Sequence, residues 1–369
     1  LLVGILPPAL LTSLSWQRAQ SLLTAPNPQA VLDNLLILQL FLVGTSLLAS
    51  VGLALFTTRG ITGPLEALRR AMGRIEQDDF EVRVPVTSND ELGYLSEGLN
   101  QMAAGLQERE RLKEAHRKVE QEMAVAWRIQ ESFLPGVVPH LPGWALAASL
   151  QPARQTSGDF YDFIPLPGGR LGLLVADVAD KGTGAALYMA LSRTVIRTYA
   201  AEHPGRPARA LAAANRRILA DTQSDLFVTV FYGVLDPAAG RLTYCNAGHN
   251  PPYLLAEEAG VPIRALDPTG MALGILDEDL WEEGEVELAG GDLLALYSDG
   301  ITEAQDSAGT FYGNERLQAA LVAAREGGGG ATAIHDALLA GVRAFVGGAP
   351  QFDDMTLMVL VRDGPEEEG

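Results

Sequence analysis

The 369-residue chain is poor in cysteine, histidine and basic residues. Its single cysteine is Cys245, so no disulfide can form within the chain, and the flanking sequence RLTYCNAG indicates a buried strand position. The 27 Lys and Arg residues are outnumbered by 46 Asp and Glu residues, which gives a net charge of −19. Nucleic-acid binding depends on clustered Lys and Arg, and no basic stripe is present, so this composition argues against nucleic acid as a partner.

One stretch lacks charge altogether. Residues 35–58, between Asp33 and Arg59, contain no Asp, Glu, Lys or Arg. As a helix this stretch would be about 36 Å long, enough to cross a bilayer, whereas buried helices of soluble proteins seldom run so far without a charge. We therefore predict a transmembrane helix. Arginines follow it closely, which predicts a cell (inner) membrane protein whose C-terminal part is cytoplasmic.

Residues 1–34 precede this helix. Residues 1–16 are apolar, but they contain a Pro-Pro pair and are too short to cross a membrane unaided. We interpret them as the stub of a first transmembrane helix, and residues 17–34 as a loop or the end of an extracytoplasmic region. The chain begins at Leu1 rather than at a methionine, so we expect a truncated N-terminus.

Two short apolar seams follow within residues 59–110. In each, apolar residues recur at alternating spacings of four and three, as in a coiled coil. The seams comprise Ile61, Leu65, Leu68, Met72 and Ile75, and then Leu92, Leu95, Leu99, Met102 and Leu106. Pro64 near the first seam and the sequence DELG at 90–93 resemble the most recognisable features of HAMP domains. We therefore predict a HAMP domain over 59–110, rather than a plain helical stalk.

A coiled-coil linker is predicted over residues 111–135. The step from Leu106 to Leu112 interrupts the heptad phase, which either lets the linker transmit a rotation or is a tolerated irregularity. The seams have no apolar surface to cover in a monomer, so we expect a parallel homodimer. The seam continues through Leu112, His116, Val119, Met123, Ala126, Gln130 and Phe133.

Four aspartates lie at the ends of apolar, strand-like runs. Asp177 ends a run in LLVADVADKGTGAAL, where it is either a helix cap or a metal ligand. Asp159 in TSGDFYDF, Asp299 in LLALYSDGITEA and Asp353 in FDDMTLMVLV occupy similar positions. Brought together, such carboxylates would repel by about 4 kcal/mol per close pair at an effective dielectric of about 20, so they would need cations. Oxygen ligands without a Cys or His cluster favour magnesium or manganese over zinc.

These motifs, in their order and spelling, resemble those of the PPM-type protein phosphatases (the 2C class), in the bacterial SpoIIE/RsbU-like branch. The resemblance covers residues 143–362 and rests on PARQTSGDFYD, VADVADKGTGAAL, FVTVFYGVLD, CNAGHNPPYLL, LLALYSDGITEA and FDDMTLMVLV. It implies an α+β αββα sandwich, in which two antiparallel sheets pack face to face between helices. The whole chain is then multidomain, with the transmembrane helix and HAMP/coiled-coil stalk before the phosphatase domain and an acidic tail at 363–369 after it.

The resemblance also implies a centre of two divalent cations, Mn²⁺ or Mg²⁺. Asp177 would bridge both ions, and the backbone carbonyl of Val178 would complete the shell of the second ion. Asp299 and Asp353 would hold the first ion, and Asp159 would act on the second directly or through a water. Such a centre activates a water for in-line attack on phosphorus, without a phosphoenzyme.

Other polar residues near these motifs have two interpretations each. Arg154 either receives the substrate phosphate or is an ordinary exposed arginine. His249 in NAGHNPP either protonates the leaving oxygen or stabilises a turn. We interpret three further aspartates as caps or as hydrogen-bond partners of the ligands: Asp162, Asp180 and Asp354.

We predict a membrane-anchored phosphoserine/phosphothreonine phosphatase controlled through HAMP and coiled coil. By resemblance, its substrate is a phosphorylated anti-anti-sigma-type protein. A non-catalytic scaffold with the same fold is an alternative that a missing acidic position would favour, and none is missing. A cyclic-dinucleotide synthase is a third, but Phe160 and Tyr161 stand where its signature requires Glu and Phe.

Overall fold

The computed structural model describes residues 28–154, 156–258, 260–278 and 280–364. The predicted membrane stub at 1–16 lies outside the described residues, as do residues 17–27 of the predicted loop and 365–369 of the acidic tail. The chain divides into two compact units, Leu1–Lys118 and Val119–Gly369.

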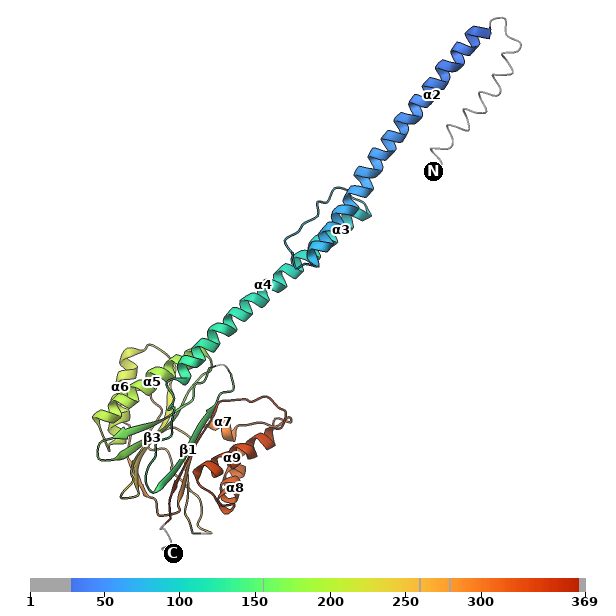
Figure 1. Ribbon diagram of the computed structural model, residues 1–369. Coiled ribbons are helices and arrows are strands. Elements are labelled where there is room, and N and C mark those ends of the chain that lie inside the picture. Colours follow the sequence, from blue (N-terminus) through green and yellow to red (C-terminus); the bar gives the residue numbers. More distant parts are fainter. Residues whose placement is uncertain (1–27, 155, 259, 279, 365–369) are drawn as a thin grey trace. The chain divides into compact units, whose positions relative to one another are not determined.

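Among the described residues of the N-terminal unit, one long helix is apolar. Helix α2 covers Pro28–Thr57 and continues through a short π-helical segment, η1 (Thr58–Thr62), into α3 (Gly63–Ile75) (Figure 1). The loop predicted up to residue 34 was therefore wrong from Pro28 onward, because proline is well tolerated in the first turn of a helix. By length and composition, Leu36–Ile75 is apolar enough to cross a membrane, and none of its most apolar window is buried.

Two helices joined by an extended segment form the HAMP region. They are α3 and the start of α4 (Glu91–Glu131). Asp90 caps α4, since its Oδ1 accepts the backbone N–H groups of Leu92 (3.1 Å) and Gly93 (3.2 Å). The connector is fixed to α4 by Asn100, whose side chain exchanges two 2.8 Å hydrogen bonds with the backbone of Val84. The two predicted seam helices thus form, with a connector that packs on the second.

The C-terminal unit is a sandwich of two five-stranded sheets, and every pairing between its named strands is antiparallel. The β1 sheet has the order β1-β10-β9-β6-β7, and the β2 sheet has the order β2-β3-β4-β5-β8. The strands are β1 (Trp144–Gln151), β2 (Phe160–Leu166), β3 (Arg170–Val178), β4 (Val228–Asp236), β5 (Arg241–Ala247), β6 (Tyr253–Leu255), β7 (Arg264–Ala265), β8 (Gly284–Glu287), β9 (Leu293–Tyr297) and β10 (Met355–Arg362).

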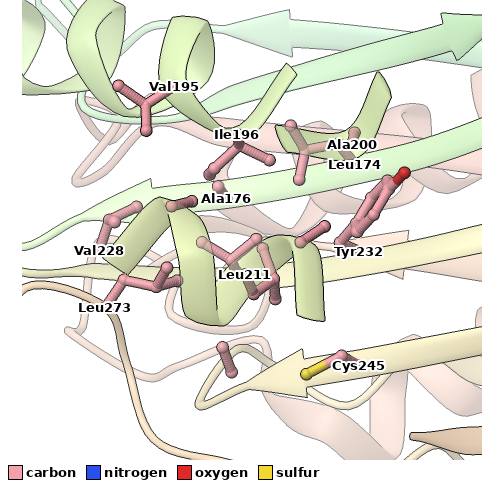
Figure 2. Packing of buried hydrophobic residues seen from close by; sticks show 14 of the residues in the cluster. Leu174, Ala176, Val195, Ile196, Ala200, Leu211, Val228, Tyr232, Cys245 and Leu273 are labelled. Atoms are coloured by element: carbon pink, nitrogen blue, oxygen red, sulfur yellow. The ribbon is translucent and has the colours of Figure 1, made fainter. Parts of the chain in front are cut away.

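Helices cover the outer face of each sheet (Figure 1). Helices α5 (Thr183–Glu202) and α6 (Pro207–Asp221) pack on the β2 sheet, where Figure 2 shows Ile196 and Leu211 against Leu174, Tyr232 and Cys245. On the other side, α7 (Asp299–Thr302), α8 (Gly313–Glu326) and α9 (Ala331–Val346) accompany the β1 sheet. Cys245 is fully buried in β5, as predicted.

Strand β3 shows how the core positions the site. Its side chains alternate between two layers because successive residues of a strand point to opposite faces. Leu174 packs under α5 and α6, whereas Leu173 and Val175 lie between the two sheets. By the same alternation Asp177 belongs to the layer between the sheets, at the end of the strand.

Candidate metal centre

Four strand ends bring the predicted ligands to one edge of the sandwich. In the β2 sheet, Phe160 pairs with Ala176, so Asp159 before β2 lies near Asp177 at the end of β3. In the β1 sheet, Tyr297 pairs with Leu357, so Asp299 after β9 lies near Asp353 before β10. Each antiparallel pair thus contributes two carboxylates, and the face-to-face packing of the sheets brings the two pairs together.

The carboxyl groups lie close enough to affect one another. Burial, followed by the charge of Asp177, raises the pKa of Asp159 well above its ordinary value. Burial, followed by the charge of Asp299, raises the pKa of Asp177 to about 7. Burial and then Asp353 raise the pKa of Asp299 to about 6. The chain therefore gathers more negative charge at this edge than it neutralises.

No group of three or more His, Cys, Asp and Glu side chains in the described ranges has the spacing of a metal shell. Two of the predicted ligands instead bind groups of the chain itself. Asp159 is buried and accepts a 2.7 Å hydrogen bond from Thr356 Oγ1. Asp353 forms a 2.7 Å ion pair with Lys181. The convergence of acidic residues was predictable from sequence, but these two partners were not.

Glycine allows the loops of the site to approach one another closely. A Cβ atom on Gly158 would lie 3.0 Å from the carbonyl oxygen of Val178, which is tighter than ordinary contact. A Cβ on Gly300, next to Asp299, would overlap the backbone of Asp354. The carbonyl proposed to face the second ion therefore lies directly beside the Asp159 loop. Oxygen donors, burial and excess negative charge together fit hard divalent cations.

The three aspartates interpreted as non-ligands each have another partner. Asp162 is paired with Arg197 (2.7 Å) and Arg193 (3.0 Å) of α5. Asp354 accepts the backbone N–H groups of Ala153 (2.7 Å) and Gly158 (3.0 Å), so it fixes the loop that carries Asp159. The exposed Asp180 has a φ of 89° and accepts the N–H of Lys181 at 2.7 Å.

The two candidate substrate residues differ in exposure. Arg154 is exposed on the loop between β1 and β2. His249 is only 2% exposed, its Nδ1 lies 2.9 Å from Thr229 Oγ1, and burial lowers its pKa to about 4. Its backbone N–H donates to Asn246 Oδ1 at 2.8 Å. A buried, neutral imidazole favours the turn-stabilising interpretation over proton donation to a leaving group.

Gln130 at the end of α4 is a contact that the sequence analysis missed. Its side chain is 4% exposed and forms two hydrogen bonds with the backbone of Ser157, two residues before Asp159. Ser157 N donates to Gln130 Oε1 at 3.1 Å, and Gln130 Nε2 donates to Ser157 O. The heptad pattern assigned Gln130 to the seam. One feature of the sequence could have distinguished Gln130 from the other seam residues. It is a polar amide at a position that is otherwise apolar, close to the end of the helix.

Comparisons with known proteins agree with this architecture. The family model described as stage II sporulation protein E (SpoIIE) matches residues 167–363, more than half of the chain. The chain belongs to the SpoIIE family. The HAMP domain model matches residues 56–108. This membership favours the phosphatase fold over the cyclic-dinucleotide synthase.

Individual relatives cover different parts of this SpoIIE-family chain. It is 30% identical to protein IcfG of Synechocystis over 82% of the chain and 51% of IcfG. It is 28% identical to phosphoserine phosphatase RsbU of Bacillus subtilis over 59% of the chain and 64% of RsbU. The chain thus spans less than two thirds of the length of these relatives. The SiaA-PP2C domain of Pseudomonas aeruginosa superposes with a TM-score of 0.59 at 22% identity, over 68% of this chain and 98% of that domain, which confirms the PP2C fold.

Proposed function

We propose that the C-terminal unit is a metal-dependent phosphatase for phosphoserine and phosphothreonine in proteins. The observation that carries this proposal is the gathering of four aspartates from four strand ends. Burial and mutual repulsion raise the pKa of three of them, Asp159, Asp177 and Asp299. The name of the similar RsbU supports the phosphoserine class. Carboxylates held this close repel one another, and a cation that binds between them offsets that repulsion.

The residues proposed to hold two divalent cations, Mn²⁺ or Mg²⁺, are Asp159, Asp177, Asp299, Asp353 and the carbonyl of Val178. Bound cations would supply Lewis-acid stabilisation of the phosphoryl oxygens and a nucleophilic water.

Neighbouring groups orient these ligands. The Thr356 hydroxyl orients the Asp159 carboxylate, and Asp354 fixes the loop before it. Arg154, exposed on that same loop, is proposed to receive the substrate phosphate, because guanidinium groups bind phosphate oxygens in bidentate fashion. His249 is proposed to hold the turn after β5, because it is buried beneath the surface.

The substrate is proposed to be a phosphorylated regulator of the anti-anti-sigma type. This proposal extends the resemblance of the motifs to the RsbU-like branch. Incubation of the chain in detergent with such a phosphoserine protein and manganese should release inorganic phosphate, and EDTA should stop the release. A chain that binds the phosphoprotein without releasing phosphate would support the non-catalytic scaffold instead.

Membrane anchoring and dimerisation are proposed for the N-terminal unit. The exposed apolar surface of α2 supports an anchor in the cell membrane, with the phosphatase in the cytoplasm. Four seam residues support a parallel dimer, since their exposed fractions lie between 53% and 58% in the single chain. These residues are Leu65, Met72, Leu95 and Met102.

Transmission of a rotation along the linker is testable by inserting one to seven residues after Arg109. If the HAMP region controls activity through helix rotation, activity in membranes should vary with helical phase and return towards the parent level at seven residues. If activity did not vary with the number of inserted residues, the linker would serve only to tether the phosphatase domain to the membrane.

A further inference from the structure

Lys181 lies on the loop between β3 and α5 and reaches across to the loop before β10. Its Nζ lies 2.7 Å from Asp353 Oδ2 and donates to the carbonyl oxygen of Phe352 at 3.3 Å. The same ammonium lies 4.8 Å from the centre of the Phe352 ring, a cation–π contact. One side chain of the Asp177 loop therefore makes three contacts with the loop that carries Asp353.

Both oxygens of the Asp353 carboxylate have partners in this arrangement. Oδ2 faces Lys181, and Oδ1 accepts the backbone N–H of Asp354 at 2.9 Å. A divalent cation needs direct contact with a carboxylate oxygen at roughly 2.0–2.6 Å. Because the ammonium carries the same sign of charge, it repels any cation that approaches the oxygen it occupies.

The Lys181–Asp353 ion pair differs from the other ion pairs of the described residues in its partner. Among the ion pairs of the described residues, Lys181–Asp353 is the one that joins a cation to a proposed metal ligand. Burial, followed by Asp353, raises the pKa of Asp299, and the charge of Lys181 opposes part of this rise. The chain thus supplies one positive charge of its own to an edge where four carboxylates gather.

We propose that Lys181 is an internal counter-ion that competes with the divalent cation for Asp353. This inference rests on the proposed function, because it takes Asp353 as a ligand. The ammonium stabilises the acidic edge when divalent cations are scarce and must leave Asp353 when a cation binds. Lys181 is therefore a positioning residue that weakens cation binding and sets the cation concentration at which the centre fills.

Lys181→Met tests the competition, because methionine keeps a long unbranched side chain without the charge. In the full chain in detergent, calorimetry with manganese should show an affinity about three- to tenfold tighter than that of the parent, as expected for the loss of a partly exposed ion pair. Lys181→Arg keeps the charge and should bind manganese with near-parent affinity. The same Lys181→Met change in an Asp353→Asn background should change manganese affinity little, because the carboxylate charge for which Lys181 and the cation compete is already gone.

A second measurement does not depend on binding by the Asp353→Asn variants. In EDTA, Lys181→Met should lower the melting temperature of the parent more than that of Asp353→Asn, in which only the Phe352 contacts of Lys181 remain to be lost. In saturating manganese the loss in the parent background should disappear. An equal loss in EDTA and in manganese, or a manganese affinity unchanged by Lys181→Met, would overturn the competition. Absence of manganese binding by the parent chain would instead overturn the proposed function.

Discussion

Asp159 and Asp162 are two buried aspartates three residues apart, with opposite environments. Asp162, within β2, faces the helix layer and is paired with Arg193 and Arg197 of α5. Asp159, just before the strand, faces the acidic edge and has a hydroxyl rather than a cation as its closest partner. Both side chains are at most 2% exposed. The chain neutralises one carboxylate with its own arginines and leaves the other beside further carboxylates.

This contrast separates structural from functional acidic residues on physical grounds. A buried carboxylate without a cation is costly, so a fold retains one only where something else compensates the charge. The charge of Asp162 is balanced by arginines of the chain itself, which fits a structural role in holding α5 against β2. Asp159 has no such cation, and among the described ion pairs Lys181 alone faces the four carboxylates, which fits a site for a diffusible cation.

The largest expected effect comes from Asp177→Asn. Loss of the proposed bridging carboxylate should lower phosphate release at least about a thousandfold and abolish high-affinity manganese binding, because both ions lose a ligand. Circular dichroism should show an intact fold, since removing a repelling charge does not destabilise the edge. Asp180→Asn is the matched control, three residues along and exposed. A mutant that binds two manganese ions with parent affinity would contradict the assignment of Asp177.

A second test uses protons as competitors with the cation for Asp177. The pKa of Asp177 is about 7, so a cation must displace a proton from it below that pH. Manganese affinity should fall about tenfold per pH unit from pH 7 to pH 5.

In EDTA, the stability of the folded chain should change with pH in the opposite direction to manganese affinity: it should rise as the pH falls. The folded chain holds protons with a pKa of about 7 that the unfolded chain, with an ordinary value of 3.8, has lost. This contribution makes the folded state more stable at pH 5 than at pH 8, and manganese at pH 8 should restore the stability. Urea unfolding at both pH values measures it. Greater stability in EDTA at pH 8 would show that the carboxylates do not repel as described.

Much of this contrast was visible in the sequence. Strand-end positions identified Asp159, Asp177, Asp299 and Asp353 because apolar runs and turn residues mark where strands stop. The antiparallel register then brings those ends together. The two-sheet fold followed from the resemblance of the motifs, and the structure confirms it.

The partners of these carboxylates were not visible in the sequence. Arg197 is distant from Asp162 along the chain, and Gln130 is 27 residues from Ser157, so only the packed fold brings them into contact. Periodicity also assigned Gln130 to the seam, because a heptad pattern records position along a helix and not the surface against which it packs. Long-range polar contacts of this kind depend on tertiary geometry.

A third prediction concerns Gln130, which links the end of α4 to the Asp159 loop. Gln130→Leu keeps the size of the side chain and removes both hydrogen bonds with Ser157, leaving two buried backbone groups unpaired. Manganese affinity and phosphate release should each fall about tenfold, because the loop that carries Asp159 loosens. Gln121→Leu, exposed on the same helix, is the control. Equal effects of the two changes would show that α4 and not the Ser157 contact matters.

The smallest effect on activity is expected from Asp162→Asn, the paired member of the comparison. Asparagine keeps an acceptor for Arg193 and Arg197 but removes the charge that compensates them. Arg197 is partly exposed and regains water, so the free energy of unfolding should fall by only about 1–3 kcal/mol in urea titrations. Manganese affinity and phosphate release at 25 °C should stay within about twofold of the parent, because Asp162 faces α5 and not the acidic edge. If Asp162→Asn remained folded but lost as much activity as Asp177→Asn, the criterion would be wrong. An ion pair with arginines of the chain would then not distinguish a structural aspartate from a metal ligand.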